Sequence, residues 1–577
     1  MTNTEISQAF NDIANLLEIQ GANRFRVRAY QNASLTIQAY PEEMSALHKN
    51  GGLKALDTIP GIGKDLAEKI EKMVTKNTCT YLDQLKKEIP AGLLDILNIE
   101  GMGPKRTKEL WQAFKITNVE KLKELCKTGK LSKRKGWGPK SVNNILRSLA
   151  LHDLHSDRLP IGHMKRTAEA MLEALTKTRL AKKIEIAGSY RRGKDTVGDL
   201  DFVASSLKPK ELLEAFTQLP QMKKIKVKGE TKCTARLDIG IDADIRVVRP
   251  EEYGAALYYS TGSRAHNVAV RKRTLKMGLT INEYGVFKGT KGHHGRVVAQ
   301  KTEQDIFKAL KLPYIPPELR ENTGELEHLP KNLIELKHMQ GDMHVHTTIS
   351  SDAESSPLEM IRAARAKGFK YIAITDHATS HGIARGVTSA SVDAYVREIK
   401  ATARKVPGIT VLVGSEVDIQ PDGSLFLPDS ALKKLDWVIA SVHSAFRQSK
   451  KDMTKRVLHA LSNPYVTVFG HPFARYVLAR APIELDFDAV LETTKRNKVL
   501  LEINASWHRL DLDDVHCRAA SATGAMTVID SDSHNADQFD LSFGVQQARR
   551  GWVEKNIVLN AQPLKTVQQW LKKKRTP

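Results

Sequence analysis

Cysteine is scarce in this sequence, and long apolar runs are missing. The 577 residues include four cysteines, which lie far apart and form no CxxC pair: Cys79, Cys126, Cys233 and Cys517. This spacing argues against a disulfide framework or a thiolate zinc site, and it suits a reducing compartment. No window approaches 18 apolar residues, and polar residues interrupt the N-terminal segment. Neither membrane spanning nor export is therefore expected, and we predict a cytoplasmic protein.

Acidic residues are too few to balance the basic ones. Lys and Arg number 89 against 66 Asp and Glu, giving a net charge of +23 and an isoelectric point near 9.6. Residues 1–338 carry +18 of this charge, and residues 339–577 carry +5. A basic surface attracts a polyanion by neutralising phosphates and releasing counterions. Charge alone is also compatible with a basic protein that binds no polyanion, so the motifs must show which of the two applies. The length predicts roughly three to five domains.

One glycine motif recurs within residues 1–150, where apolar positions have helical spacing. It reads IPGIGKDLAEKI at 59–70, IEGMGPKRTKEL at 99–110 and RKGWGPKSVNNIL at 134–146. Close glycines let a backbone approach a phosphate, and helix N-terminal N–H groups point at it. One copy is usually an ordinary turn, but three copies, each with a lysine, predict binding to a phosphate backbone. The predicted binding residues are Gly61, Gly63, Lys64, Gly101, Gly103, Lys105, Gly138 and Lys140.

Paired carboxylates occur in a set of short strands that begins at residue 183. The runs KIEIAGSY (183–190), LDFVAS (200–205) and DADIRVV (242–248) predict an α+β sheet. Residues i and i+2 of a strand point to one face, so Asp199 and Asp201 are forced together. A lone pair of this kind is usually a solvated strand edge. Combined with a carboxylate of DADIR and the AGSYRRG turn, it predicts a Mg²⁺ site that takes a triphosphate.

This ordered set of motifs resembles the nucleotidyltransferase palm of family X DNA polymerases, the group that includes the polymerase beta type. YYSTGSRAHNVAVR (258–271), GLTINEYGVF (278–287) and LPYIPPELRE (312–321) are similar to further segments of that family. The resemblance implies catalytic, metal-binding roles for Asp199, Asp201 and Asp244, with Asp242 a bystander. It also implies nucleotide-binding roles for Gly188, Ser189, Arg192, Gly198, Tyr259, Gly262, Asn267 and Arg271.

Within that resemblance, Ser189 and Arg192 would hold the incoming triphosphate and Tyr259 would lie beside the sugar. Asn267 and Arg271 would lie near the nascent base pair. Ser260 stands where the family has its second aromatic residue, which bears on sugar discrimination and dNTP affinity. The glycine motifs would be helix-hairpin-helix elements that grip the DNA backbone.

PGIGKDLAEKI is also similar to the lyase subdomain of polymerase beta. Lys69 falls on the position of the Schiff-base lysine, and Asp65 stands where the family has a neighbouring lysine. A lysine amine is a nucleophile only when its pKa is lowered. An ordinary surface lysine beside DNA is the competing interpretation of Lys69.

From about residue 339 short apolar runs alternate with helical patterns, which predicts a βα barrel or related parallel sheet. Seven of these runs end in, or lead into, His, Asp, Glu or Asn. Imidazole and carboxylate groups bind Zn²⁺, Mn²⁺ and Fe²⁺, and an HxH pair on a strand turns both rings to one face. A single buried histidine is usually structural, but nine ligand-type residues at strand ends predict a metal centre. They are His344, His346, Asp352, His377, Glu416, His443, His471, Asp532 and His534.

This set resembles the PHP (polymerase and histidinol phosphatase) domain, a distorted barrel of the (β/α)7 type with three metal ions. The resemblance implies one ion on His344, His346, Glu416 and Asp532. A second would lie on Glu416, His443 and His471, and a third on Asp352, His377 and His534. The spacing from His346 to Asp352 is one residue longer than usual, and Ala353 replaces the customary Gly. Counted backwards from His377, however, Asp352 falls on the position that the family pattern expects.

The two resemblances together cover essentially the whole chain. They imply a helical lyase-like domain (1–90), a helical fingers-like domain (91–152), a palm (153–252), a thumb (253–315), a linker (316–338) and a PHP domain (339–577). The implied enzyme is a family X DNA polymerase that fills short gaps during DNA repair, combined with a PHP 3'-5' exonuclease or related phosphodiesterase. Implied cofactors are Mg²⁺ or Mn²⁺ in the palm and up to three Mn²⁺ or Zn²⁺ ions in the PHP domain.

The expected partners are gapped or primer–template DNA and dNTPs, with no membrane, and we expect a monomer. Three alternatives stay open on sequence alone. The first is a nuclease that keeps its polymerase half as a DNA clamp. The second is a phosphatase of small phosphate esters, and the third is a non-enzymatic DNA-binding scaffold.

Overall fold

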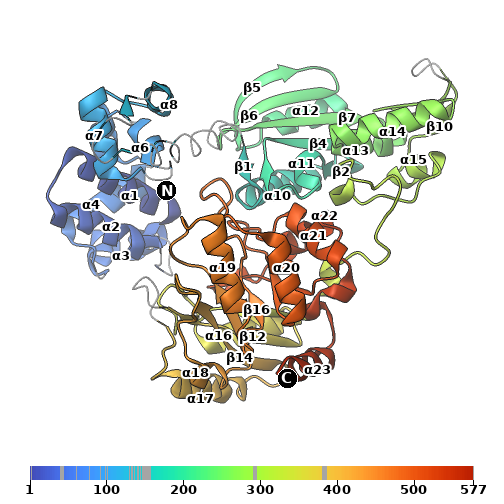
Figure 1. Cartoon of the computed structure of the whole chain (residues 1–577). Helices are drawn as coiled ribbons and strands as arrows, with labels where there is room; N and C mark the ends of the chain where they lie inside the picture. The colour runs from blue at the N-terminus through green and yellow to red at the C-terminus, as the bar shows by residue number, and fades with distance from the viewer. Residues whose placement is uncertain are drawn as a thin grey trace. The chain divides into compact units, whose positions relative to one another are not determined.

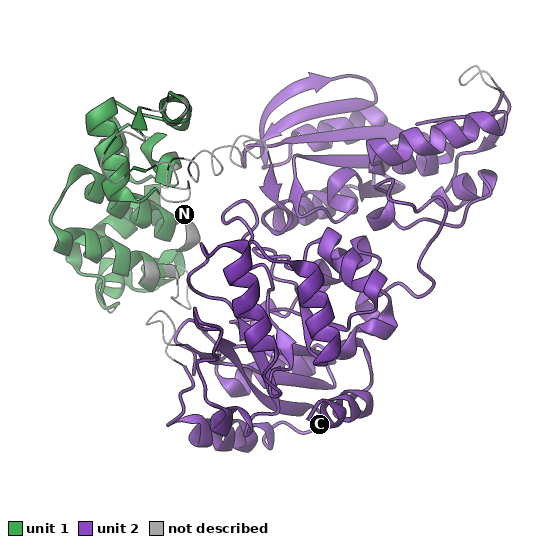
Figure 2. Ribbon diagram, in the orientation of Figure 1, with its two compact units in different colours: residues 1–156 green, residues 157–577 purple. Residues whose placement is uncertain are grey.

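The chain forms two compact units, residues 1–156 and 157–577, in the computed structural model (Figure 2). The structure describes residues 1–577 except 2, 39, 41–43, 60, 77, 91, 98, 100, 101, 129, 132, 133, 135, 136, 139–141, 143, 144, 146–157, 290–294, 380–385, 576 and 577. No helix among the described residues is long and apolar enough to cross a bilayer.

Helices make up the regular structure described in the first unit. They are α1 (Asn3–Gln20), α2 (Arg24–Gln38), α3 (Met44–Asp57), α4 (Lys64–Lys76), α5 (Thr80–Glu88), α6 (Gly92–Leu97), α7 (Pro104–Phe114) and α8 (Val119–Lys127). One buried apolar cluster joins them. Helix α4 begins directly after Gly63 and α7 directly after Gly103, as the glycine motifs predict. Gly101 and Lys140 lie outside the described residues.

A five-stranded sheet forms the first part of the second unit, in the order β2-β4-β7-β6-β5. Its strands are β2 (Lys183–Ile186), β4 (Asp199–Ser205), β5 (Met222–Lys228), β6 (Lys232–Leu237) and β7 (Asp242–Val248), flanked by β1 (Leu159–Pro160) and β3 (Thr196–Val197). Helices α10 (Ile161–Lys177), α11 (Gly188–Arg191) and α12 (Pro209–Thr217) accompany it (Figure 1). The three predicted strands are confirmed. Strand β5 was not predicted, because its alternating lysines give an almost wholly exposed edge strand.

Helices α13 (Tyr253–Thr261), α14 (Arg264–Lys276) and α15 (Glu303–Ala309) follow, with a small sheet in the order β10-β9-β8. Its strands are β8 (Leu279–Asn282), β9 (Gly285–Lys288) and β10 (Val297–Ala299). Side chains of residues 316–338, which were predicted to form a linker, are packed against the preceding helices. Arg320 is fully buried against Glu303, with 2.6 Å between Nη1 and Oε1, and Oε1 of Glu325 lies 2.7 Å from Nδ1 of buried His266. A buried ion pair and a buried hydrogen bond thus hold a segment that lacks hydrophobic periodicity.

Parallel strands make up the last part of the chain, in the order β11-β12-β14-β15-β16-β17-β18. They are β11 (Gly341–Val345), β12 (Tyr371–Ile374), β14 (Thr410–Asp418), β15 (Trp437–Ser441), β16 (Val468–Phe469), β17 (Leu500–Asn504) and β18 (Thr527–Asp530). All seven predicted strands are present, and the two-residue β13 (His377–Ala378) pairs with β14. A bridge between Val345 and Ser533 nearly closes the sheet into the expected barrel.

Helices lie outside this barrel (Figure 1). They are α16 (Pro357–Ala366), α17 (Val392–Ala403), α18 (Asp429–Leu432), α19 (Lys450–Leu461), α20 (Phe487–Arg496), α21 (Asp514–Thr523), α22 (Ser542–Arg550) and α23 (Leu564–Arg575). Both faces of the strands are covered, so the strands read as continuous apolar runs. The polar residues after those runs therefore gather at one rim of the barrel.

Candidate active sites

The predicted aspartates of the five-stranded sheet lie at one end of two parallel neighbours. Asp199 and Asp201 begin β4, and Asp244 on β7 stands opposite Asp201 in register. Asp244 accepts a hydrogen bond from the Thr234 hydroxyl at 2.5 Å. Asp242, opposite Asp199, instead pairs with two basic side chains, Lys226 at 2.6 Å and Arg236 at 3.1 Å. Asp242 is thus already neutralised by two cations. Asp244 has one basic partner, Lys232, whose Nζ lies 3.2 Å from Oδ1, and Asp244 faces Asp201 across the two strands.

Burial and nearby negative charge raise the pKa values of two of these carboxylates, Asp199 and Asp201. Burial, followed by the charges of Asp199 and Asp244, raises the pKa of Asp201 to about 7. Burial and Asp244 also raise the pKa of Asp199. A cation between the carboxylates would remove both costs, because an opposite charge favours the ionised form. The donor set suits Mg²⁺ or Mn²⁺, which prefer oxygen ligands.

A pocket of about 600 Å³ adjoins the aspartates. Its wall includes Asp199, Asp201 and seven of the predicted nucleotide-binding residues: Gly188, Ser189, Arg192, Tyr259, Gly262, Asn267 and Arg271. Gly198 and Asp244 do not line it. The Ser189 hydroxyl is buried without a hydrogen-bond partner, as is Oδ1 of Asn267. Buried polar atoms in this state indicate a polar ligand, because an unsatisfied group is costly.

Arg192 on this wall is already engaged. Its Nε donates to Glu321 at 3.0 Å and its Nη1 to the carbonyl of Thr261 at 2.5 Å. Arg158 also lines the pocket and was not predicted, since it belongs to no motif. It donates to Oγ1 of Thr196 at 2.9 Å and lies where the pairing of β1 with β3 brings it near Asp199. The sequence carries no local signal for Arg158.

The predicted ligands of the C-terminal region meet at the carboxyl ends of the barrel strands. Glu416 on β14 is paired in register with His377 on β13. The remaining members lie on β11, in the turn after it, or just beyond the ends of β15, β16 and β18. Strand ends of a parallel barrel converge on one rim, which is where such folds place their sites. The structure brings all nine residues together there.

Glu416 is the group that most of the histidines share. Its Oε2 lies 3.4 Å from Nε2 of His344 and 3.5 Å from Nε2 of His346. Its Oε1 lies 3.2 Å from Nε2 of His443 and 2.8 Å from Nε2 of His471. Glu416 is 1% exposed. One carboxylate at the centre of several imidazoles can bridge two metal ions.

Asp352 joins the cluster despite its longer spacing from His346. Its Oδ2 lies 3.2 Å from Nε2 of His377 and 3.6 Å from Nε2 of His534. Asp532 also belongs to the cluster, with Oδ1 3.3 Å from Nε2 of His346. Asp352 and His534 are the more exposed members, with 34% and 28% of their side-chain surface accessible. The cluster therefore opens to solvent on their side.

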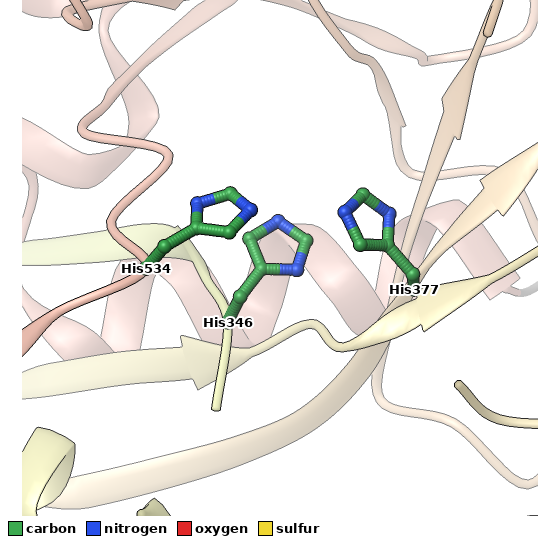
Figure 3. A group of neighbouring side chains, drawn as sticks. All are labelled: His346, His377 and His534. Atoms are coloured by element: carbon green, nitrogen blue, oxygen red, sulfur yellow. The ribbon is translucent and has the colours of Figure 1, made fainter. Parts of the chain in front are cut away.

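Three compact groups within the cluster have ligand atoms that all lie within 4.8 Å of one another. They are His346, His377 and His534; His344, His346 and Glu416; and His377, Glu416 and His443. Figure 3 shows the first group, with the ring of His346 between the other two and 4.2 Å from each between ring centroids. His377 thus approaches two of the three predicted ion positions.

Unsatisfied donor atoms in this cluster indicate metal ligands. Nε2 of His344, both ring nitrogens of His346 and Nδ1 of His471 are buried without a hydrogen bond. His471 and Asp532 also adopt positive φ angles of 25° and 55°, which non-glycine residues rarely do. Such conformations concentrate at functional sites. Nitrogen and carboxylate donors in this number fit Mn²⁺ or Zn²⁺.

Supporting residues around the cluster were not predicted. Nδ1 of His344 lies 2.6 Å from Oε1 of Glu502, and Nδ1 of His443 lies 2.8 Å from Oδ1 of Asp418. Such partners fix the tautomer and orientation of a ligating imidazole. A signal for Asp418 does exist in the sequence. It stands two residues after Glu416 on one strand and so shares its face.

Electrostatics in the cluster favour ionised carboxylates. Burial alone would raise the pKa of Glu416, but positive charge on His443, His344 and His377 holds it well below its usual value. The pKa of Asp532 is likewise held well below normal, against burial, by His344 and His346. The carboxylates are thus poised as anions, the form that binds metal.

The residues predicted to bind DNA, and Lys69, belong to the first unit. Gly61, Gly63, Lys64, Gly103, Lys105 and Gly138 are described, and all of them are exposed. Lys69 lies on α4, with Nζ 2.5 Å from Oδ1 of Asp65 and 5.5 Å from the centre of the Tyr81 ring. Their roles in binding DNA, and that of Lys69 as a lyase nucleophile, stay predictions.

Family models match most of the chain. They are a helix-hairpin-helix domain (residues 1–79), a SAM-like helix-hairpin-helix tandem (93–150), a DNA polymerase beta palm (158–237), a DNA polymerase beta thumb (256–321) and a PHP domain (342–506). The chain matches the DNA polymerase/3'-5' exonuclease PolX of Bacillus subtilis (strain 168) at 34% identity, over 99% of this chain and all of that protein.

A probable phosphatase of Thermoanaerobacter sp. (strain X514) is 30% identical over 41% of this chain and 95% of its own length. A probable phosphatase of Caldicellulosiruptor saccharolyticus is 31% identical over 34% of this chain and 80% of its own length. These relatives match only part of the chain, whereas the Bacillus protein matches it from end to end. The chain therefore belongs to the PolX family.

Proposed function

We propose that this protein is a DNA polymerase that adds dNTPs at short gaps and a 3'-5' exonuclease that removes nucleotides at its PHP centre. Gap filling in base-excision repair would use both activities. The observation that carries the proposal is the pair of separate sites in one chain. One gathers three carboxylates beside a pocket with unsatisfied polar atoms, and the other gathers nine metal-ligand side chains.

In the palm, Asp199, Asp201 and Asp244 would hold Mg²⁺ or Mn²⁺. Bound ions would lower the pKa of the primer 3'-hydroxyl and neutralise charge on the triphosphate. The primer 3'-hydroxyl would lose its proton to solvent, and O3' would form a bond to the α-phosphorus while the bond from that phosphorus to the bridging oxygen breaks and pyrophosphate leaves. The free hydroxyl of Ser189 would donate to a phosphate oxygen, and Arg192 would contribute its charge there. Asn267 and Arg271 would border the base pair.

At the PHP centre, the nine ligands would hold up to three Mn²⁺ or Zn²⁺ ions. Bound ions would lower the pKa of a water molecule and polarise the phosphodiester. The water oxygen would bond to phosphorus while the bond from phosphorus to O3' breaks. A nucleoside 5'-monophosphate would leave, and the 3'-oxygen of the shortened strand would take up the proton that the water loses, which gives a 3'-hydroxyl. The glycine motifs of residues 1–150 would grip the DNA backbone through N–H groups and lysines.

An assay on gapped DNA tests this function. We expect the protein, supplied with Mn²⁺ or Mg²⁺ and an end-labelled primer at a short gap, to extend the primer when dNTPs are present. Without dNTPs, we expect it to shorten the primer from its 3' end. Removal of metal with EDTA should abolish both reactions, and Mn²⁺ should restore them. A protein that hydrolyses histidinol phosphate unhindered by competing DNA, but leaves the primer intact, would instead be a small-ester phosphatase.

Gly188 offers a sharper test of the palm pocket. Its φ is +61°, and a Cβ there would lie 2.2 Å from Oδ2 of Asp201. We expect Gly188→Ala to displace this carboxylate and slow primer extension at least about tenfold, as loss of a positioned metal ligand does. Steady-state extension kinetics would measure the loss.

Gly240 provides the matched control for that substitution. Its φ is +89°, and nothing lies within 4 Å of a Cβ added there. Gly240→Ala thus introduces similar backbone strain without touching a carboxylate, and extension should stay within about twofold of the parent. Equal losses in the two variants would mean that strain, rather than the position of Asp201, limits the reaction.

A further inference from the structure

A second pocket, of about 550 Å³, lies between the palm helix α10 and the rim of the PHP barrel. Its palm side includes Lys165, Arg166 and Ala170, all on α10. Its barrel side includes Trp507 and the predicted metal ligand Asp532. The pocket thus adjoins the metal centre while one of its walls belongs to the polymerase part of the chain.

Close packing fixes this wall against the barrel. A Cβ at Gly162 would lie 2.0 Å from the Trp507 ring, so α10 approaches that ring as only glycine allows. Nζ of Lys165 pairs with Oδ2 of Asp540 at 2.6 Å. Leu510 and Phe543 of the PHP part belong to the same apolar cluster as the core of the palm sheet. The pocket is therefore a preformed feature of the second unit.

The lining suits a nucleoside better than a phosphate chain. Trp507 and Phe543 supply aromatic surface, against which bases pack. The positive charges of Lys165 and Arg166 are matched by acidic side chains that also line the pocket, including Glu169 on α10 and Asp540 on the barrel side. A groove that tracks phosphates would instead be basic throughout. The volume lies within the range of about 300–1,000 Å³ usual for small-molecule sites.

We propose that this pocket holds the base and sugar of the 3'-terminal nucleotide while its 5'-phosphate lies at the PHP metal ions. The inference rests on the proposed exonuclease function and adds to it a substrate subsite in which α10 of the palm takes part. The leaving nucleoside 5'-monophosphate would occupy the pocket after cleavage. The polymerase part would then be required for excision as well as for extension.

A variant that fills the pocket tests the wall on α10. Ala170 is an exposed helix residue on that wall, so Ala170→Trp adds bulk without removing a contact. We expect it to raise KM for 3'-5' hydrolysis of a single-stranded oligonucleotide about tenfold, the loss of roughly one base stack. Thr176→Trp adds the same side chain to an exposed position of α10 outside the pocket, and should leave KM within about twofold. Equal KM values in the two variants would refute the subsite.

Product binding provides a readout independent of turnover on DNA. With Mn²⁺ present, calorimetric titration should show that dAMP binds the parent protein more tightly than inorganic phosphate does. Trp507→Ala should weaken dAMP about tenfold and leave phosphate unchanged, while Trp507→Phe should restore most of the dAMP affinity. Trp570→Ala removes a partly buried tryptophan from α23 and is the control for general damage.

Hydrolysis of bis-p-nitrophenyl phosphate, which has neither base nor sugar, separates this inference from the proposed function. The subsite predicts that Ala170→Trp and Trp507→Ala keep this activity within about twofold. If the parent hydrolyses neither the ester nor DNA, the exonuclease function itself fails. If it hydrolyses both, but dAMP binds no better than phosphate, the function stands and the subsite is wrong.

Discussion

Glu416→Gln is expected to abolish 3'-5' hydrolysis, with a loss of at least about a thousandfold, and to leave primer extension within about twofold. The substitution keeps the shape of the side chain and removes its charge. Glu416 lies within 3.5 Å of ring nitrogens of His344, His346, His377, His443 and His471. A neutral amide cannot bridge two cations as a carboxylate does, so the metal affinity of the whole centre should fall.

Measurement of bound metal distinguishes this cause from misfolding. Elemental analysis after gel filtration should give less Mn²⁺ or Zn²⁺ per chain in Glu416→Gln than in the parent. Glu398→Gln makes the same chemical change on an exposed position of α17 and should alter neither metal content nor hydrolysis. Retained hydrolysis in Glu416→Gln would place the nuclease centre elsewhere. Equal loss of hydrolysis and extension would contradict two independent sites.

The barrel could be predicted well because each of its strands is buried on both faces. Such strands appear as continuous apolar runs, and all seven were located. The clustering of the candidate ligands could be predicted because polar residues directly after such runs are conspicuous and, in a parallel barrel, must share one rim. Asp352 is one residue further from His346 than usual. The turn after β11 nevertheless brings its carboxylate to His377.

Residues outside repeated patterns could not be predicted. Arg158 reaches the palm pocket only through the pairing of β1 with β3, and Trp507 meets Gly162 only because palm and barrel pack together. Glu321 is a third case. It accepts from Arg192 and from Arg550 of α22, each at 3.0 Å, and so joins the palm pocket to the PHP part. Contacts between residues this far apart in sequence leave no local periodicity.

Asp201→Asn is expected to abolish primer extension, with a loss of at least about a thousandfold, while hydrolysis at the PHP centre continues. The carboxylate borders the pocket and faces Asp244, so its loss removes a ligand that no neighbour replaces. Single-nucleotide extension with saturating dNTP and Mn²⁺ would measure the effect. Extension at the parent rate would contradict the palm assignment and favour a nuclease that uses its polymerase half as a DNA clamp.

The same substitution should stabilise the metal-free protein, because the pKa of Asp201 is raised in the folded state. A carboxylate whose pKa rises from 3.8 to about 7 on folding destabilises the folded state wherever it must ionise. In EDTA, the gain from Asp201→Asn should therefore be absent below about pH 4, grow up to about pH 7 and level off above it. At pH 8 we expect Tm to rise by roughly 2–5 °C. Addition of Mg²⁺ should raise Tm in the parent and not in the variant.

Asp242→Asn is the matched control, because Asp242 lies on the same sheet and its pKa is shifted in the opposite direction. The ion pairs with Lys226 and Arg236 overcome the effect of burial and lower the pKa of Asp242, so its charge stabilises the fold at neutral pH. Asp242→Asn should thus lower Tm slightly at pH 8, lose that effect as the pH falls through the folded pKa, and leave extension nearly intact. If both variants changed Tm in the same direction, the burial of Asp201 beside the charges of Asp199 and Asp244 would not be what makes this site favour a cation.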